Sequence, residues 1–77
     1  MDMKMVDVLV HVDETLENHD RGRLQDHIRE LDGVLAVSSQ DKRPHLISVE
    51  YDPDRTSSQS ILAQVHSDGL HAELVGL

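Results

Sequence analysis

Residues 45–53, with the sequence His-Leu-Ile-Ser-Val-Glu-Tyr-Asp-Pro, contain the pattern that decides the fold of this chain. Ile47, Val49 and Tyr51 alternate with other residues, and this period of two predicts a strand with one buried face. The pair Asp52-Pro53 is typical of a turn, because proline cannot donate a hydrogen bond to a sheet and aspartate bonds its own backbone. We therefore expect a strand from His45 to Tyr51 that ends at this pair.

The residues before this strand predict its pairing partner. Gln40 to Pro44 is polar and contains a proline, which favours a turn, and Val34 to Ser39 resumes an extended pattern. These two strands are expected to form a hairpin. At the start of the chain, residues 6–12 alternate valine with Asp7, Leu9 and His11, which predicts another strand whose core side is all valine.

Two helices are predicted between the strands. Leu24, Ile28 and Leu31 recur at helical spacing, and Asp32-Gly33 is a stop signal, so the first helix is expected over residues 17–31. Thr56-Ser57-Ser58-Gln59 has the form of a capping box at the start of the second helix.

The second helix and the segment after it complete the pattern. Ile61, Leu62 and Val65 form the buried stripe of the helix, Gly69 suits a left-handed turn, and residues 72–75 alternate as a last short strand. The order is β-α-β-β-α-β. It predicts an α+β, ferredoxin-like sandwich, with a four-stranded antiparallel sheet and two helices on one face. At this length we expect a single domain over residues 1–77.

Composition excludes several classes of partner. The formal charge is -8, and the chain has one tyrosine and neither phenylalanine nor tryptophan, so both charge and stacking capacity disfavour nucleic acid. The same charge disfavours anionic membrane surfaces, and no apolar run has the length of a membrane span or a signal peptide, so we expect a cytoplasmic protein. Cysteine is absent, which excludes disulfides and thiolate metal sites.

A set of packing and turn residues runs over most of the chain: Leu24, Ile28, Leu31, Gly33-Val34, Val49 to Pro53, Ile61, Val65, Gly69 and Ala72 to Val75. Their types and spacing resemble those of the heavy-metal-associated domain, the family of small copper chaperones. The resemblance implies a ferredoxin-like fold and a non-catalytic, metallochaperone-like role in binding metal ions. Counting back from Gly33, the family's metal-binding Cys-x-x-Cys falls on Glu17-Asn18-His19-Asp20, with carboxylates at both thiolate positions. This substitution disfavours copper(I), which prefers sulfur.

The histidines suggest an alternative metal site. The predicted topology brings five of the six histidines to one edge of the sandwich: His11, His19, His45, His66 and His71. His11 and His71 are expected to be close neighbours on antiparallel strands, on the face away from the helices. Nearby carboxylates could complete a site for zinc, nickel, cobalt or copper(II). The predicted ligands are His11, His71, Glu17, His19 and Asp20.

Two other interpretations stay open. The histidines and carboxylates could be ordinary exposed residues at loop ends, since their spacing matches no compact metal motif. The chain could also be a cysteine-less module that binds a protein partner or forms a homodimer, because Leu9, Leu46 and Val75 are expected on the open face of the sheet. No nucleophile-base arrangement, phosphate loop or HExxH-type motif is present, so we expect no catalysis.

Overall fold

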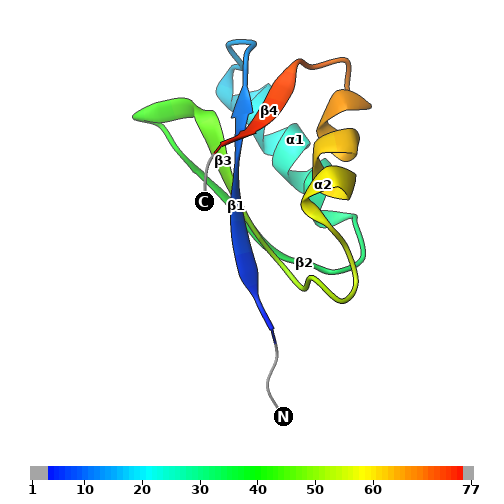
Figure 1. Ribbon diagram of the computed structural model, residues 1–77. Helices are drawn as coiled ribbons and strands as arrows, with labels where there is room; N and C mark the ends of the chain where they lie inside the picture. Colours follow the sequence, from blue (N-terminus) through cyan, green and yellow to red (C-terminus); the bar gives the residue numbers. More distant parts are fainter. Residues whose placement is uncertain (1–3, 76–77) are drawn as a thin grey trace.

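The computed structural model describes residues 4–75 and shows the predicted order of elements. The strands are β1 (Val6–Val12), β2 (Val34–Gln40), β3 (Arg43–Tyr51) and β4 (Ala72–Val75), and the helices are α1 (Asn18–Arg29) and α2 (Ser58–His66). The strands form one antiparallel sheet in the order β2-β3-β1-β4, with both helices against one face (Figure 1). The predicted ferredoxin-like fold is confirmed.

The core lies between the sheet and the helices, and it is built from the alternating and helical patterns of the sequence. β1 and β3 each bury every second residue, and each helix buries one stripe, because these periods place the apolar side chains on one side of their element. Val6 is an exception: it was expected on the buried side but lies exposed at the end of β1. The buried apolar residues are Val8, Val10, Val12, Leu24, Ile28, Val37, Ile47, Val49, Tyr51, Ile61 and Val65.

The register of the sheet decides which side chains meet on its open face. β1 is the central partner of both β3 and β4, and His11 lies opposite Leu46 on one side and Glu73 on the other. The main-chain amide of Asp13 continues the ladder beyond β1 by donating to the carbonyl of His71 at 2.8 Å. His11 therefore has Glu73 as its direct cross-strand neighbour, instead of His71 as expected.

Several predicted boundaries differ from the structure by one or two residues. α1 begins at Asn18 and ends at Arg29, inside the predicted range. The hairpin turn is confined to residues 41 and 42, so Pro44 lies within β3 and not in the turn. The predicted capping box is displaced by one residue, since Ser57 is the N-cap and its hydroxyl accepts from the amide of Ser60.

Two glycines have the left-handed backbone that their positions require. Gly33 has φ +100° after α1, and Gly69 has φ +80° after α2. At Gly33 the carbonyl also accepts from the amide of Asp52 at 2.8 Å, which ties this turn to the end of β3. Among residues 4–75, no helix has both the length and the apolar character needed to cross a membrane.

Candidate metal centre

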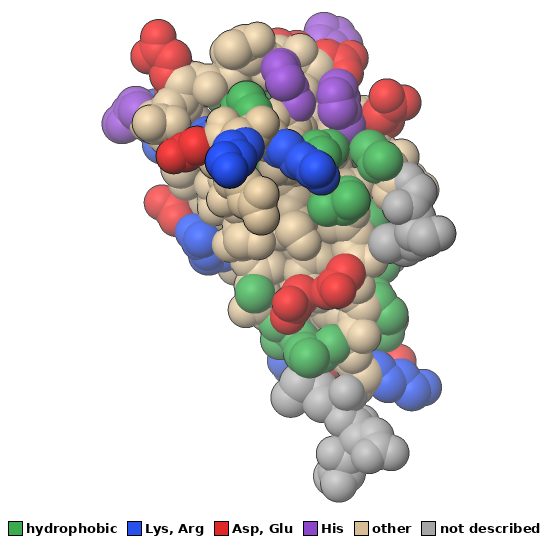
Figure 2. Space-filling view, turned by 90° about the vertical axis from the view of Figure 1, so that its left-hand side faces the viewer, with side chains coloured by type: hydrophobic (Ala, Val, Ile, Leu, Met, Phe, Trp, Pro, Cys, Tyr) green, Lys and Arg blue, Asp and Glu red, His purple; other side chains and the backbone are tan. Residues whose placement is uncertain are grey.

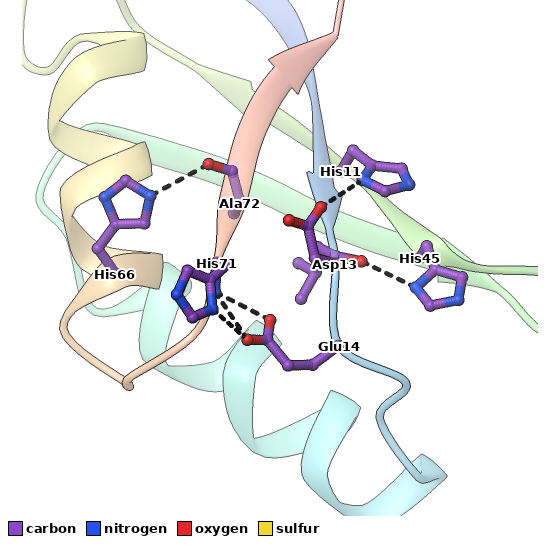
Figure 3. Close-up of polar contacts among 8 residues, drawn as sticks. His11, Asp13, Glu14, His45, His66, His71 and Ala72 are labelled. Carbon is purple, nitrogen blue, oxygen red and sulfur yellow. Dashed lines mark hydrogen bonds and ion pairs between the residues drawn. The ribbon is translucent and has the colours of Figure 1, made fainter.

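Three side chains with metal-binding groups meet on the open face of the sheet, at the end of β1. His11 and Asp13 are two residues apart and share a face, and Glu73 lies opposite His11 on β4. One possible ligand atom from each of the three lies within 4.8 Å of the others. The imidazole Nδ1 of His11 is 3.2 Å from Oδ1 of Asp13 (Figure 3). We call His11, Asp13 and Glu73 the strand-end group.

The donor atoms of the strand-end group suit metal ions that are intermediate between hard and soft. A neutral imidazole and two carboxylates suit zinc, nickel, cobalt or copper(II), whereas copper(I) prefers sulfur ligands. Asp13 and Glu73 are exposed and His11 is half-buried, so an ion could reach the group from solvent. Metal-to-ligand distances near 2 Å require these donors to approach one another more closely, and exposed side chains can do so by changing rotamer.

His71, which the sequence places beside His11, makes a different contact. Its Nδ1 lies 2.7 Å from Oε2 of Glu14, and its main-chain amide donates to both oxygens of the same carboxylate (Figure 3). The hydrogen bond to Glu14 raises the pKa of His71, and the same bond lowers the pKa of Glu14. The pair closes the turn before β4 onto the segment after β1, and His71 lies outside the strand-end group.

The predicted ligands at the start of α1 are exposed and separate from the strand-end group. Glu17 is the N-cap residue, yet its side chain makes no capping hydrogen bond. Asp20 is in the first turn of α1, where a carboxylate is favoured by the positive end of the helix dipole. His19 is exposed beside it. The metal-ligand role of these three residues stays a prediction.

A buried arginine engages the carboxylate of Asp41, at the hairpin turn. The side chain of Arg21 is almost fully enclosed, and its Nη2 donates to Oδ1 of Asn18 at 3.0 Å and to Oδ1 of Asp41. Because a buried guanidinium needs an anionic partner, this contact holds Asp41 at the hairpin turn against α1. Asp41 is thus engaged in an ion pair.

Two further histidines are oriented by main-chain carbonyls. Nδ1 of His45 lies 2.8 Å from the carbonyl oxygen of Val12, and Nε2 of His66 lies 3.1 Å from the carbonyl oxygen of Ala72 (Figure 3). The ring of His45 also stacks on that of His11, with centroids 5.7 Å apart and planes at 19°. His45 lies just beyond Leu46, the last residue of β3 that pairs with β1.

The sixth histidine lies away from this end of the sheet. His27 is half-buried on α1, and its Nδ1 is 2.9 Å from Oδ1 of Asp68. Both residues line an open hollow of about 700 Å³ beside α1, together with Asp26 and Glu30.

The open face of the sheet, away from the helices, carries different kinds of side chain along its length. Histidine side chains gather at one end of it, with apolar and basic side chains beside them and acidic side chains further along (Figure 2). Leu9 and Leu46 border a small hollow of about 130 Å³ on this face with Arg43, and Leu9 lies opposite Val75. A protein partner or a second copy of the chain at this face stays a prediction.

Comparisons with known proteins place the fold. No family model matches the sequence, and no curated protein matches it. Solved structures match at low identity. Oxidized MerP from Ralstonia metallidurans CH34 is 16% identical with a TM-score of 0.85, and the match covers 95% of this chain and 100% of that one. The apo-form copper chaperone of Enterococcus hirae is 22% identical with a TM-score of 0.79, covering 88% and 98%.

A third match has a metal ion bound. The N-terminal domain of a potential copper-translocating P-type ATPase from Bacillus subtilis, in its Cu(I)-loaded state, is 16% identical with a TM-score of 0.84, and the match covers 95% of this chain and 90% of that one. The chain thus has the fold of heavy-metal-associated and copper-chaperone domains, in a form without cysteine. At these identities the likeness establishes the fold alone.

The sequence named some members of the strand-end group and missed others. His11 is among the predicted ligands, whereas Asp13 and Glu73 are not. The missing information is the β1-β4 register, which places Glu73 beside His11 and displaces His71. His71 and Glu73 are two residues apart, so strand alternation gives them the same face of the sheet but different neighbours on β1.

Proposed function

We propose that the protein is a non-catalytic, metallochaperone-like domain that binds one divalent transition-metal ion at the strand-end group. The observation that carries this proposal is the convergence of His11, Asp13 and Glu73, whose possible ligand atoms lie within 4.8 Å of one another. The fold supports it, because several structures of the same fold are described as copper-binding domains or a copper chaperone. A cytoplasmic location stays a prediction.

The donor set selects the class of ion. Imidazole nitrogen and carboxylate oxygen favour zinc, nickel, cobalt and copper(II), and the chain has no thiolate for copper(I). The two carboxylates would neutralise the charge of a divalent ion. The overall charge of -8 adds a long-range attraction for cations, which salt weakens.

Zinc titration with a ligand variant tests the proposal. We expect saturable binding of ZnCl₂ by calorimetry, together with displacement of the imidazole signals of His11 in NMR spectra. The Glu73→Gln variant should bind at least about tenfold more weakly, because it removes one anionic ligand. Glu50→Gln is the matched control, since Glu50 is a glutamate on the same sheet but lies opposite Asp7 and not His11.

Two results would contradict the metal-binding function. One is the absence of saturable zinc or nickel binding below about millimolar concentrations, which is the weakness expected of scattered exposed side chains. The other is an equal loss of affinity in Glu73→Gln and Glu50→Gln, which would indicate a diffuse charge effect. The same spectra test His71, Glu17, His19 and Asp20, because a ligand role at either place would shift the signals of His71 or His19 at the same zinc concentration.

A further inference from the structure

His45 is held in a way that leaves one ring nitrogen free. Its Nδ1 lies 2.8 Å from the main-chain carbonyl oxygen of Val12, and a carbonyl can only accept a hydrogen bond. Nδ1 must therefore carry the proton. Since a neutral imidazole has a single N–H, its Nε2 then has an unshared electron pair, which is the form that binds metal ions.

This arrangement is the one that metal-binding histidines use. Such residues commonly donate their second ring N–H to a main-chain carbonyl or a carboxylate, which fixes the tautomer and the orientation of the ring. His45 has this partner before any ion arrives. His66 is also bonded to a main-chain carbonyl, but through Nε2 and across the other side of β4 (Figure 3).

His45 is also next to the strand-end group. Its ring stacks on the ring of His11, with centroids 5.7 Å apart and planes at 19°. The two residues come from neighbouring strands, β1 and β3, and Figure 3 shows both rings on the same side of Asp13. Nδ1 of His11 is buried and faces Asp13, so the ring of His11 has to turn before it can share an ion with both Asp13 and His45.

The strand-end group alone leaves a tetrahedral ion one ligand short. Zinc in proteins is almost always four-coordinate at closed sites, and the group supplies three side chains. We propose that His45 is the fourth ligand, through Nε2, so that the ion is held by two imidazoles and two carboxylates. This inference rests on the proposed function and names the ligand that completes the same site.

Formation of the site requires the ligands to move, because His45 lies outside the group of ligand atoms within 4.8 Å of one another. Two nitrogens bound to one tetrahedral zinc ion, each at about 2.0–2.1 Å, are about 3.3 Å apart, which is less than the separation of the stacked ring centres. The half-exposed ring of His11 can rotate toward His45 while His45 keeps its bond to Val12, because rotamer changes of accessible side chains are fast. A second imidazole also favours zinc, nickel and copper(II) over magnesium and calcium, which prefer oxygen.

The test compares His45→Gln with His66→Gln, a matched control that also removes an imidazole bonded to a main-chain carbonyl. With ZnCl₂ as the probe, we expect His45→Gln to weaken binding at least about tenfold and His66→Gln to leave it unchanged. With CuCl₂, pulsed EPR should count two imidazoles on the ion in the wild-type protein and one in His45→Gln. Far-UV circular dichroism checks that both variants are folded.

A measurement on the wild-type protein needs no variant. The ¹⁵N signals of His45 should show Nδ1 protonated before zinc is added, and Nε2 should move on zinc binding while Nδ1 stays protonated. If zinc binds to the strand-end group with one imidazole and His45→Gln has the same affinity, the role of His45 is overturned while the proposed function stands. If the wild-type protein binds neither ion, both are overturned.

Discussion

An added methyl group should destabilise the folded protein more at Gly33 than at Gly69 or Gly22. Its φ of +100° is unfavourable for residues with a side chain, and a Cβ there would lie 2.8 Å from Cβ of Arg55 and 3.1 Å from Cγ2 of Thr56. These two atoms are close to the main chain, so they cannot swing aside like the end of a long side chain. Gly33→Ala must therefore displace the loop between β3 and α2.

The size of the effect follows from two terms. Left-handed backbone costs a residue with a side chain about 1–2 kcal/mol, partly offset by about 0.4–1 kcal/mol because alanine makes the unfolded chain less flexible. Steric overlap in a packed region adds about 1–3 kcal/mol. We expect Gly33→Ala to lower the free energy of unfolding by about 2–4 kcal/mol. A core at this chain length supplies only about 3–5 kcal/mol, so the variant should be at the limit of folding.

Two other glycines provide controls for the separate terms. Gly69 has φ +80° but no atom within 4 Å of an added Cβ, so Gly69→Ala should cost only about 1 kcal/mol. Gly22 lies within α1 with the same free space, so Gly22→Ala should stabilise the protein by up to about 1 kcal/mol through helix propensity. Urea denaturation followed by circular dichroism measures all three. Equal losses in Gly33→Ala and Gly69→Ala would refute the steric argument.

Three further predictions concern local contacts. In the metal-free protein, the pair of Glu14 and His71 should stabilise the fold most between their ordinary pKa values of 4.5 and 6.5. Its contribution is lost as pH rises through the raised pKa of His71 or falls through the lowered pKa of Glu14. Glu14→Gln should therefore lower the pKa of His71 in an NMR titration, and an unchanged value would contradict the contact. Ser57→Ala should cost about 0.5–2 kcal/mol by removing the cap of α2, unlike Thr56→Ala, as denaturant midpoints would show. Ile61→Val should cost about 0.5–1.5 kcal/mol in the same assay, because Ile61 is fully buried.

The elements of the fold follow from local patterns. Ile47, Val49 and Tyr51 alternate along β3, and Leu24 and Ile28 repeat along α1, so each element shows its buried side without reference to the others. The boundaries were less predictable. Pro44 was assigned to the turn by its residue type, but it lies in β3 where the register with β2 shifts between Ile47 and Arg43 and where pairing with β1 has ended, a bulged position that tolerates proline.

The candidate site was only partly predictable. The sequence brings His11 to the correct end of the sheet, but it cannot show that Glu73, and not His71, lies opposite. It also brings His45 to that end, but it cannot show that the ring of His45 stacks on that of His11. The missing information lies where two strands meet, since pairing depends on contacts between distant residues.

The sequence by itself determined the order of strands and helices, the apolar core and the absence of thiolate ligands. These properties depend on composition and on the spacing of neighbouring residues. Only the tertiary structure decided that His11, Asp13 and Glu73 converge and that His45 stacks beside them with one nitrogen held by a carbonyl. The physical reason is that a metal site requires donor atoms within a few ångströms, and that proximity is set by strand register and ring orientation.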